Sequence, residues 1–143
     1  MPYALNSELF NLAMSKQAKP LMDAVKKHLK ENVEPIMEEF FTLQNAKENR
    51  WSWHPRQLEL LEDAKTKAKK SGLWNFFLPG SEIGKGLTNL DYAYIAAELG
   101  KYALASETLN CSAPDTGNME VLERVGTDAQ NEKWLKPLLT AKR

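Results

Sequence analysis

Apolar residues between positions 21 and 41 recur at steps of three and four, and this spacing constrains the fold more than any other feature of the chain. It places them on one face of a helix. The stripe consists of Leu21, Val25, Leu29, Val33, Ile36, Met37, Phe40 and Phe41. Pro35 falls inside the pattern and removes a helical hydrogen bond, so we expect the helix to bend near Val33.

A second helix is predicted to begin at Pro55 and to end at Ser71 and Gly72, because proline suits the first turn and glycine the C-terminal stop. Its expected inner face is Leu58, Leu61, Ala64 and Ala68. Thr88 with Asp91 forms a capping box for a third helix, which stops at Gly100. That helix is expected to run through Leu90, Ala93, Tyr94, Ala97 and Glu98.

Three shorter helices complete the predicted set. One lies around residues 103–109, and the next ends at Gly126 after Met119, Leu122 and Val125. Thr127 and Gln130 then form a capping box for a last helix, which Pro137 should bend or end. This last helix carries Trp134, Leu135 and Leu138.

Neither strand alternation nor an internal repeat is visible, so the predicted fold is an all-α, up-and-down helical bundle of five or six helices. A length of 143 residues with 43 % hydrophobic residues suits one domain. We expect an N-terminal arm or short helix over residues 1–15 and the helical domain over residues 16–143. Residues 73–79 are too short for a buried helix and are predicted to enter the core as an extended plug.

Nineteen basic and nineteen acidic residues cancel, so the chain has no long-range field for nucleic acid or an anionic membrane. No apolar run approaches the roughly 18 residues that cross a bilayer. The first fifteen residues carry no Lys or Arg, unlike secretory and mitochondrial leaders. We therefore expect a cytoplasmic protein with no nucleic-acid partner and no membrane partner.

The residues alone supply no complete active site. The loop at 80–86 departs from a phosphate loop, since three residues rather than four separate its first glycines and Gly86 replaces the Ser or Thr. Cys111 would need His28 or His54 brought beside it for nucleophilic chemistry, so a buried or pocket-lining thiol is favoured. No metal-ligating cluster is visible. We expect no catalytic, cofactor-binding or metal-binding residue.

Residues 110–126 are unusual for a connection between helices, which needs only a few turn residues. Their first half is small and polar with Pro and Gly, and their second half has a helical apolar pattern. The stretch holds no His, no Lys and no carboxylate cluster. We interpret it as a surface shaped for contact.

Several motifs, in order along the chain, closely resemble acyl-CoA dehydrogenases. They are GLWNFFLP at 72–79, GLTNLDYA at 86–93, AELG at 97–100, NCSAPDTGNMEVL at 110–122 and WLKPLL at 134–139. Enzymes of this family bind FAD and desaturate an acyl-CoA thioester, and they have an N-terminal helical domain, a middle β-domain and a C-terminal helical domain. The resemblance covers residues 15–142 and only the first of these parts.

The resemblance implies that this chain forms one wall of the acyl pocket, with Leu109, Ser112, Ala113 and Thr116 near the fatty tail. FAD would belong to the full-length enzyme and would not bind this chain alone, which we expect to be inactive. The implied partners are acyl-CoA and the FAD-binding β-domain, and exposed apolar area predicts a homo-oligomer. The alternative is a stand-alone helical module that binds a protein or lipid through the surface near Trp74 and Trp134.

Overall fold

The computed structural model describes residues 12–46, 49, 51–80 and 82–141. All regular elements in these ranges are helical. The predicted arm over residues 1–15 lies largely outside the described residues. Its last part is held to the domain, since the Ser15 N–H donates to Asp91 Oδ1 at 2.7 Å and the Tyr94 hydroxyl donates to the Leu12 carbonyl.

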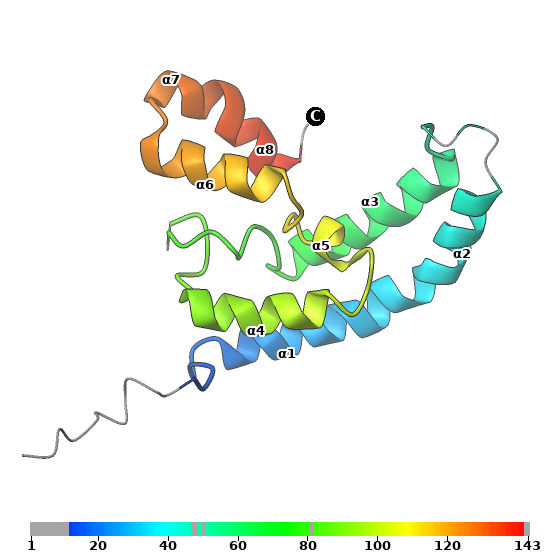
Figure 1. The fold of residues 1–143 in the computed structure, drawn as a ribbon, viewed down its shortest axis with the longest axis horizontal. Helices are drawn as coiled ribbons and strands as arrows, with labels where there is room; N and C mark the ends of the chain where they lie inside the picture. The colour runs from blue at the N-terminus through cyan, green and yellow to red at the C-terminus, as the bar shows by residue number, and fades with distance from the viewer. Residues whose placement is uncertain (1–11, 47–48, 50, 81, 142–143) are drawn as a thin grey trace, which may run out of the picture.

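The predicted first helix is one continuous, bent run (Figure 1). It consists of α1 (Lys19–His28), a π-helical turn η2 (Leu29–Val33) and α2 (Glu34–Asn45). Pro35 is the second residue of α2, and the N–H of Glu34 just before it bonds to the Leu29 carbonyl five residues back. The π turn takes up the disruption that proline imposes on the helical ladder. The predicted bend near Val33 is confirmed.

The last helical run repeats this arrangement. It consists of α7 (Asp128–Gln130), the π-helical η3 (Asn131–Leu135) and α8 (Lys136–Thr140). Pro137 is the second residue of α8, and the N–H of Lys136 donates to the Asn131 carbonyl. The predicted capping box is confirmed, because the Gln130 N–H donates to the Thr127 hydroxyl and the Thr127 N–H to the Gln130 amide oxygen.

Helix α3 (Pro55–Lys70) begins where it was predicted to begin and ends at Ser71, but Leu58 is not on its inner face. The Leu58 side chain is 48 % exposed, whereas Gln57 is fully buried. The Gln57 amide donates to the Phe40 carbonyl at 3.1 Å and to Gln44 Oε1 at 3.0 Å, and it accepts from the His54 N–H. Burying an amide costs little free energy when its polar atoms are hydrogen-bonded, so Gln57 takes the inward position.

Helix α4 (Asn89–Leu99) has the predicted Thr88–Asp91 capping box and the predicted end at Gly100. Its buried residues are Asp91, Ile95 and Leu99, whereas Ala93, Tyr94 and Ala97 lie on the exposed side. The Ser15 N–H, followed by Thr88, lowers the pKa of Asp91 because these donors stabilise the carboxylate. A single carboxylate therefore caps α4 and fixes the start of the first helical run.

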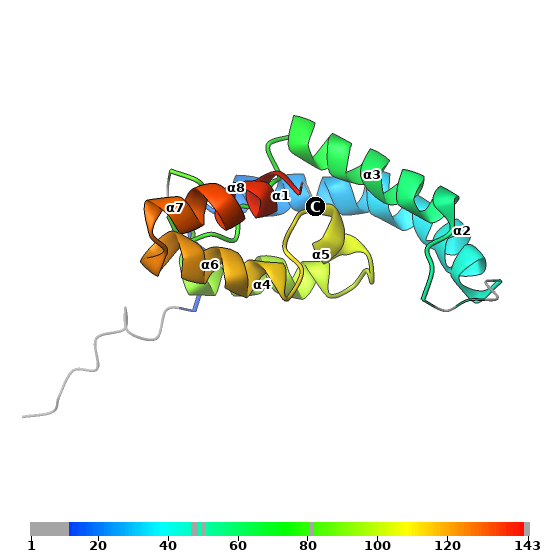
Figure 2. The ribbon, with the colours of Figure 1, turned by 90° about the horizontal axis from the view of Figure 1, so that it is seen from above.

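Helices α5 (Ala105–Thr108) and α6 (Asp115–Val125) complete the set, and α6 stops at Gly126 as predicted. Helix α4 lies along α1, α3 lies along α2, and α6 packs against η3 and α8 (Figures 1 and 2). With each bent run counted once, the described residues form six helical units. The all-α fold is confirmed.

Residues 73–79 form the predicted plug. Leu73, Phe76, Phe77 and Leu78 are all buried. The rings of Phe76 and Phe77 lie 6.2 and 6.4 Å from the ring of Tyr92 on α4, as centroid distances. The segment contains turns instead of one straight strand, and Asn75 within it has a φ of 56°. Its aromatic side chains form part of the core together with Tyr92 of α4.

Candidate functional site

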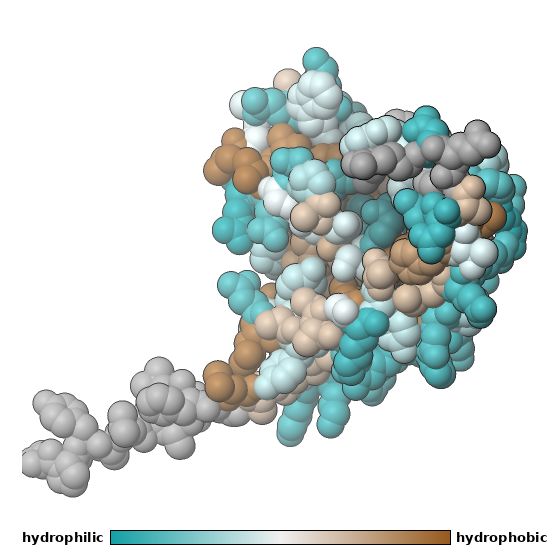
Figure 3. Space-filling model, turned by 45° about the vertical axis from the view of Figure 1, so that its right-hand side comes forward, coloured by the Kyte–Doolittle hydropathy of each residue, from teal (hydrophilic) through white to brown (hydrophobic). Residues whose placement is uncertain are grey.

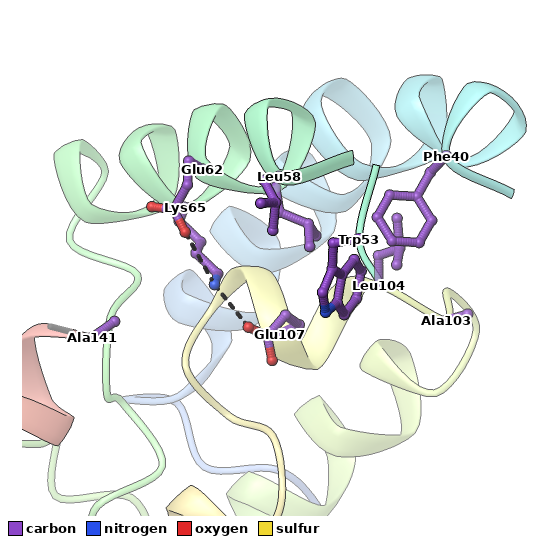
Figure 4. A pocket seen from close by; sticks show the side chains of 10 residues that line it. Phe40, Trp53, Leu58, Glu62, Lys65, Ala103, Leu104, Glu107 and Ala141 are labelled. Carbon is purple, nitrogen blue, oxygen red and sulfur yellow. Dashed lines mark ion pairs between the residues drawn. The ribbon is translucent and has the colours of Figure 1, made fainter. Parts of the chain in front are cut away.

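A groove of about 570 Å³ lies between α3 and α5 (Figure 4). The loop before α3 closes one end with Trp53, and Ala141 lies at the other end. Its volume is in the range typical of small-molecule sites. The lining residues are Phe40, Trp53, Leu58, Leu61, Glu62, Lys65, Ala103, Leu104, Glu107 and Ala141.

The polar part of the groove is centred on Lys65. Its ammonium group lies 2.7 Å from Glu107 Oε1 and 3.3 Å from Glu62 Oε1, and its side chain is 12 % exposed. The long stem of Lys65 runs from α3 toward α5 (Figure 4), so the ion pair with Glu107 joins the two helices across the groove. This ion pair could not be predicted from the sequence, because its partners come from helices far apart along the chain.

The four residues predicted to line the acyl pocket lie between the end of α5 and the first turn of α6. Leu109 is fully buried in the core, Ser112 and Thr116 are half-buried, and Ala113 is exposed. None of the four lines the groove described above. Their role toward an acyl group stays a prediction.

Two asparagines next to these residues form a buried cluster that the sequence did not reveal. Asn110 Nδ2 donates to Asn75 Oδ1 at 2.6 Å and to the Leu138 carbonyl at 3.1 Å. Asn75 Nδ2 and the Trp74 indole N–H both donate to the Leu139 carbonyl, at 2.9 and 2.8 Å. The cluster therefore adds side-chain donors to two carbonyls at the C-terminal end of α8, and the Leu138 carbonyl also accepts from the Ala141 N–H at 3.1 Å.

Both asparagines have left-handed backbones, with φ of 56° for Asn75 and 57° for Asn110. Asparagine tolerates this region better than most residues other than glycine. The visible signal in the sequence is an Asn within the apolar segment at 73–79 and a second Asn at the start of the small, polar stretch that follows Leu109. Their pairing could not be read from the sequence, because it depends on how residues 73–79 enter the core.

Cys111 has the environment of an inert thiol. Burial raises the pKa of Cys111 to about 12, and the Tyr92 side chain and the Phe77 backbone are its hydrogen-bonding neighbours. A thiol with such a pKa is almost entirely protonated at neutral pH, so it is a poor nucleophile. The preference for a buried thiol is confirmed.

The two histidines have other partners. His28 Nε2 lies 3.3 Å from the Thr108 hydroxyl and its Nδ1 lies 3.4 Å from Asn32 Nδ2. Burial, with a smaller contribution from Lys67, lowers the pKa of His28. His54 Nδ1 accepts from the Arg56 N–H and caps α3. Both rings thus serve helix packing and capping.

Close backbone packing shapes the loop at 80–86 around Gly84. The Gly84 N–H is already donated to the Gly80 carbonyl at 2.8 Å. A Cβ at Gly84 would lie 1.9 Å from the Leu78 carbonyl oxygen, so the glycine is needed for close backbone packing. The Gly84 N–H is therefore not available to an anion.

Within the described ranges, His, Cys, Asp and Glu side chains nowhere gather in threes as a metal site would require. The helices of these ranges all fall short of the length and apolar character that a bilayer crossing needs. On the face shown in Figure 3, apolar side chains form separate patches among polar ones. Large apolar residues are exposed on α6 and η3, namely Val121, Val125 and Trp134.

Comparison with known proteins gives a consistent result. The family described as "Acyl-CoA dehydrogenase, N-terminal domain" matches residues 15–142. The chain is 44 % identical over 131 residues to mouse "Acyl-CoA dehydrogenase family member 10" and 42 % identical over 140 residues to chicken "Acyl-CoA dehydrogenase family member 11". These alignments cover 88 % and 96 % of this chain.

A solved structure described as a putative acyl-CoA dehydrogenase from Mycobacterium abscessus superposes with a TM-score of 0.76 at 39 % identity, over 90 % of this chain. The chain corresponds to 32 % of that structure's chain and to 12 % and 17 % of the mouse and chicken proteins. The family match, the structural similarity and the sequence identities agree over nearly all of the chain. It belongs to the acyl-CoA dehydrogenase family, in the part that forms the N-terminal domain.

Proposed function

We propose that this chain acts as the N-terminal helical domain of an FAD-dependent acyl-CoA dehydrogenase that desaturates acyl-CoA thioesters in fatty-acid oxidation. The observation that carries the proposal is the family match across residues 15–142, supported by a six-unit helical fold with a TM-score of 0.76 to a putative acyl-CoA dehydrogenase. The buried thiol and the two engaged histidines supply no reactive centre of their own. Catalysis would therefore depend on polypeptide beyond this domain.

In this proposal the domain contributes one wall of the acyl channel. Ser112, Ala113 and Thr116 would face the fatty tail, and these half-buried or exposed residues offer small side chains that leave space. Leu109 would support the wall from the core. FAD would be held by the β-domain.

Exposed apolar residues support a further contact surface. Val121 and Val125 are one helical turn apart on α6, and Trp134 lies on η3, which packs against α6. Burying such area is favourable by about 25 cal/mol per Å². We propose that this side meets the β-domain or another copy in a homo-oligomer.

A size change at Ala113 tests the wall assignment. In the longer protein, Ala113→Phe should lower kcat/KM for long acyl-CoA substrates about tenfold while short ones change little, because the larger ring fills the channel. Initial rates over a chain-length series measure this. Asn118→Phe, at an exposed α6 position, is the matched control. An equal loss for all chain lengths would place Ala113 outside the channel.

The reading frame after Arg143 distinguishes this function from a stand-alone interaction module. A continuation into a β-rich segment supports the dehydrogenase. A stop codon at that point supports a helical module that binds a protein or lipid.

A further inference from the structure

The groove between α3 and α5 has two chemically different ends. Phe40, Trp53, Leu58 and Leu104 make one end apolar, and Glu62, Lys65 and Glu107 make the other end charged (Figure 4). Trp53 is 55 % exposed, and its ring centroid lies 5.9 Å from that of Phe40. A ligand that matches both ends has an apolar body and a polar head.

The charges at the polar end favour a positive head group. One ammonium group, that of Lys65, faces two carboxylates, which leaves one negative charge uncompensated among the lining residues. Each carboxylate can accept about four hydrogen bonds, so the contact with Lys65 does not exhaust either of them. Glu62 is 67 % exposed and can accept a further donor from the solvent side. An anionic head would meet net repulsion here.

The apolar end suits the same ligand. Leu58 lies on the rim of the groove, and its side chain is exposed instead of being buried in the core. The neighbouring Trp53 offers a large aromatic surface, which attracts organic cations as well as alkyl chains. Hydrophobic contact and charge therefore favour the same class of molecule.

We propose that this groove binds a small amphiphilic organic cation. Its ammonium group lies against the solvent side of Glu62, next to the Lys65–Glu107 ion pair, and its alkyl portion lies over Trp53 and Leu58. The site is separate from the predicted acyl-pocket residues, none of which lines the groove. The proposal does not depend on the proposed dehydrogenase function.

Calorimetric titration of the 143-residue chain tests the site with octyltrimethylammonium as the probe. Octyl sulfate, which has the same alkyl chain and the opposite charge, is the matched comparison ligand. We expect a Kd on the order of 1 mM for the cation. The anion should bind at least about threefold more weakly, given the modest strength of exposed charge contacts. Equal binding of both probes, or no binding of the cation at ~10 mM, would overturn the proposal.

Two substitutions should change the affinity in opposite directions. Glu62→Gln removes a negative charge at an exposed position and should weaken cation binding roughly three- to fivefold. Lys65→Gln removes the competing ammonium group and should strengthen it by a similar factor. Glu132→Gln, whose carboxylate pairs with Lys136 on the last helical run, is the control and should change nothing. Weaker cation binding in Lys65→Gln would contradict the assignment, and Glu62→Gln keeps the test valid if that variant does not fold.

Discussion

Replacing Phe76 by alanine should lower the free energy of unfolding by about 3–5 kcal/mol, the largest effect we expect from a single substitution. Phe76 has no exposed surface and lies in the plug at 73–79, within the hydrophobic core. Its ring packs near Tyr92 on α4. Truncation would leave a cavity that residues 73–79 cannot close, because turns and hydrogen bonds fix their backbone.

Urea unfolding followed by circular dichroism measures the effect. Domains have stabilities of about 5–15 kcal/mol, so Phe76→Ala should shift the midpoint strongly or leave part of the chain unfolded in water. Phe41→Ala is the matched control, since Phe41 is 36 % exposed and its ring meets that of Phe40 edge to face. It should cost about 1 kcal/mol. Equal losses in the two variants would contradict the central position of the plug.

Replacing Asn110 by alanine should cost about 3 kcal/mol. The substitution removes the donor to Asn75 Oδ1 and one of the donors to the Leu138 carbonyl, and an unsatisfied buried polar group such as Asn75 Oδ1 costs about 1–3 kcal/mol. It also places an alanine at a φ of 57°, where a Cβ adds about 1 kcal/mol or more. Because Asn110 holds the end of α8, the loss of stability should be greatest in that helix.

Asn110→Gly separates the two contributions. Glycine tolerates the left-handed backbone, so this variant should lose mainly the hydrogen bonds and be about 1 kcal/mol more stable than Asn110→Ala. In both variants, amide hydrogen exchange in α8 should accelerate more than exchange in α3. Asn118→Ala, at an exposed position, is the control. Unchanged exchange in α8 would show that the asparagine cluster does not hold this helix.

The features that could be predicted from the sequence are those set by neighbouring residues. The Thr88–Asp91 and Thr127–Gln130 capping boxes depend on residues three apart, and both formed where the sequence indicated. Pro35 predicted a bend because the missing N–H is a local property. Local signals of this kind also indicated both ends of α3 and α4 and the end of α6 at Gly126.

The features that were missed depend on distant partners. Gln57 is buried in place of Leu58 because its amide reaches the Phe40 carbonyl on another helix. The pairing of Asn75 with Asn110 and that of Lys65 with Glu107 arise only after the plug and α5 are in place. Apolar periodicity describes one helix at a time. It could not reveal the Asn75–Asn110 pair, the Lys65–Glu107 pair or the groove between α3 and α5.

We propose that this domain is a helical scaffold whose redox cofactor is bound elsewhere in a longer polypeptide. Flavin retention tests it most directly: the 143-residue chain and a longer protein from the same reading frame are each mixed with FAD, desalted and scanned for visible absorbance. We predict a colourless short chain, and a longer protein that stays yellow and is bleached by acyl-CoA. A short chain that retains stoichiometric FAD and is bleached by acyl-CoA would contradict the account.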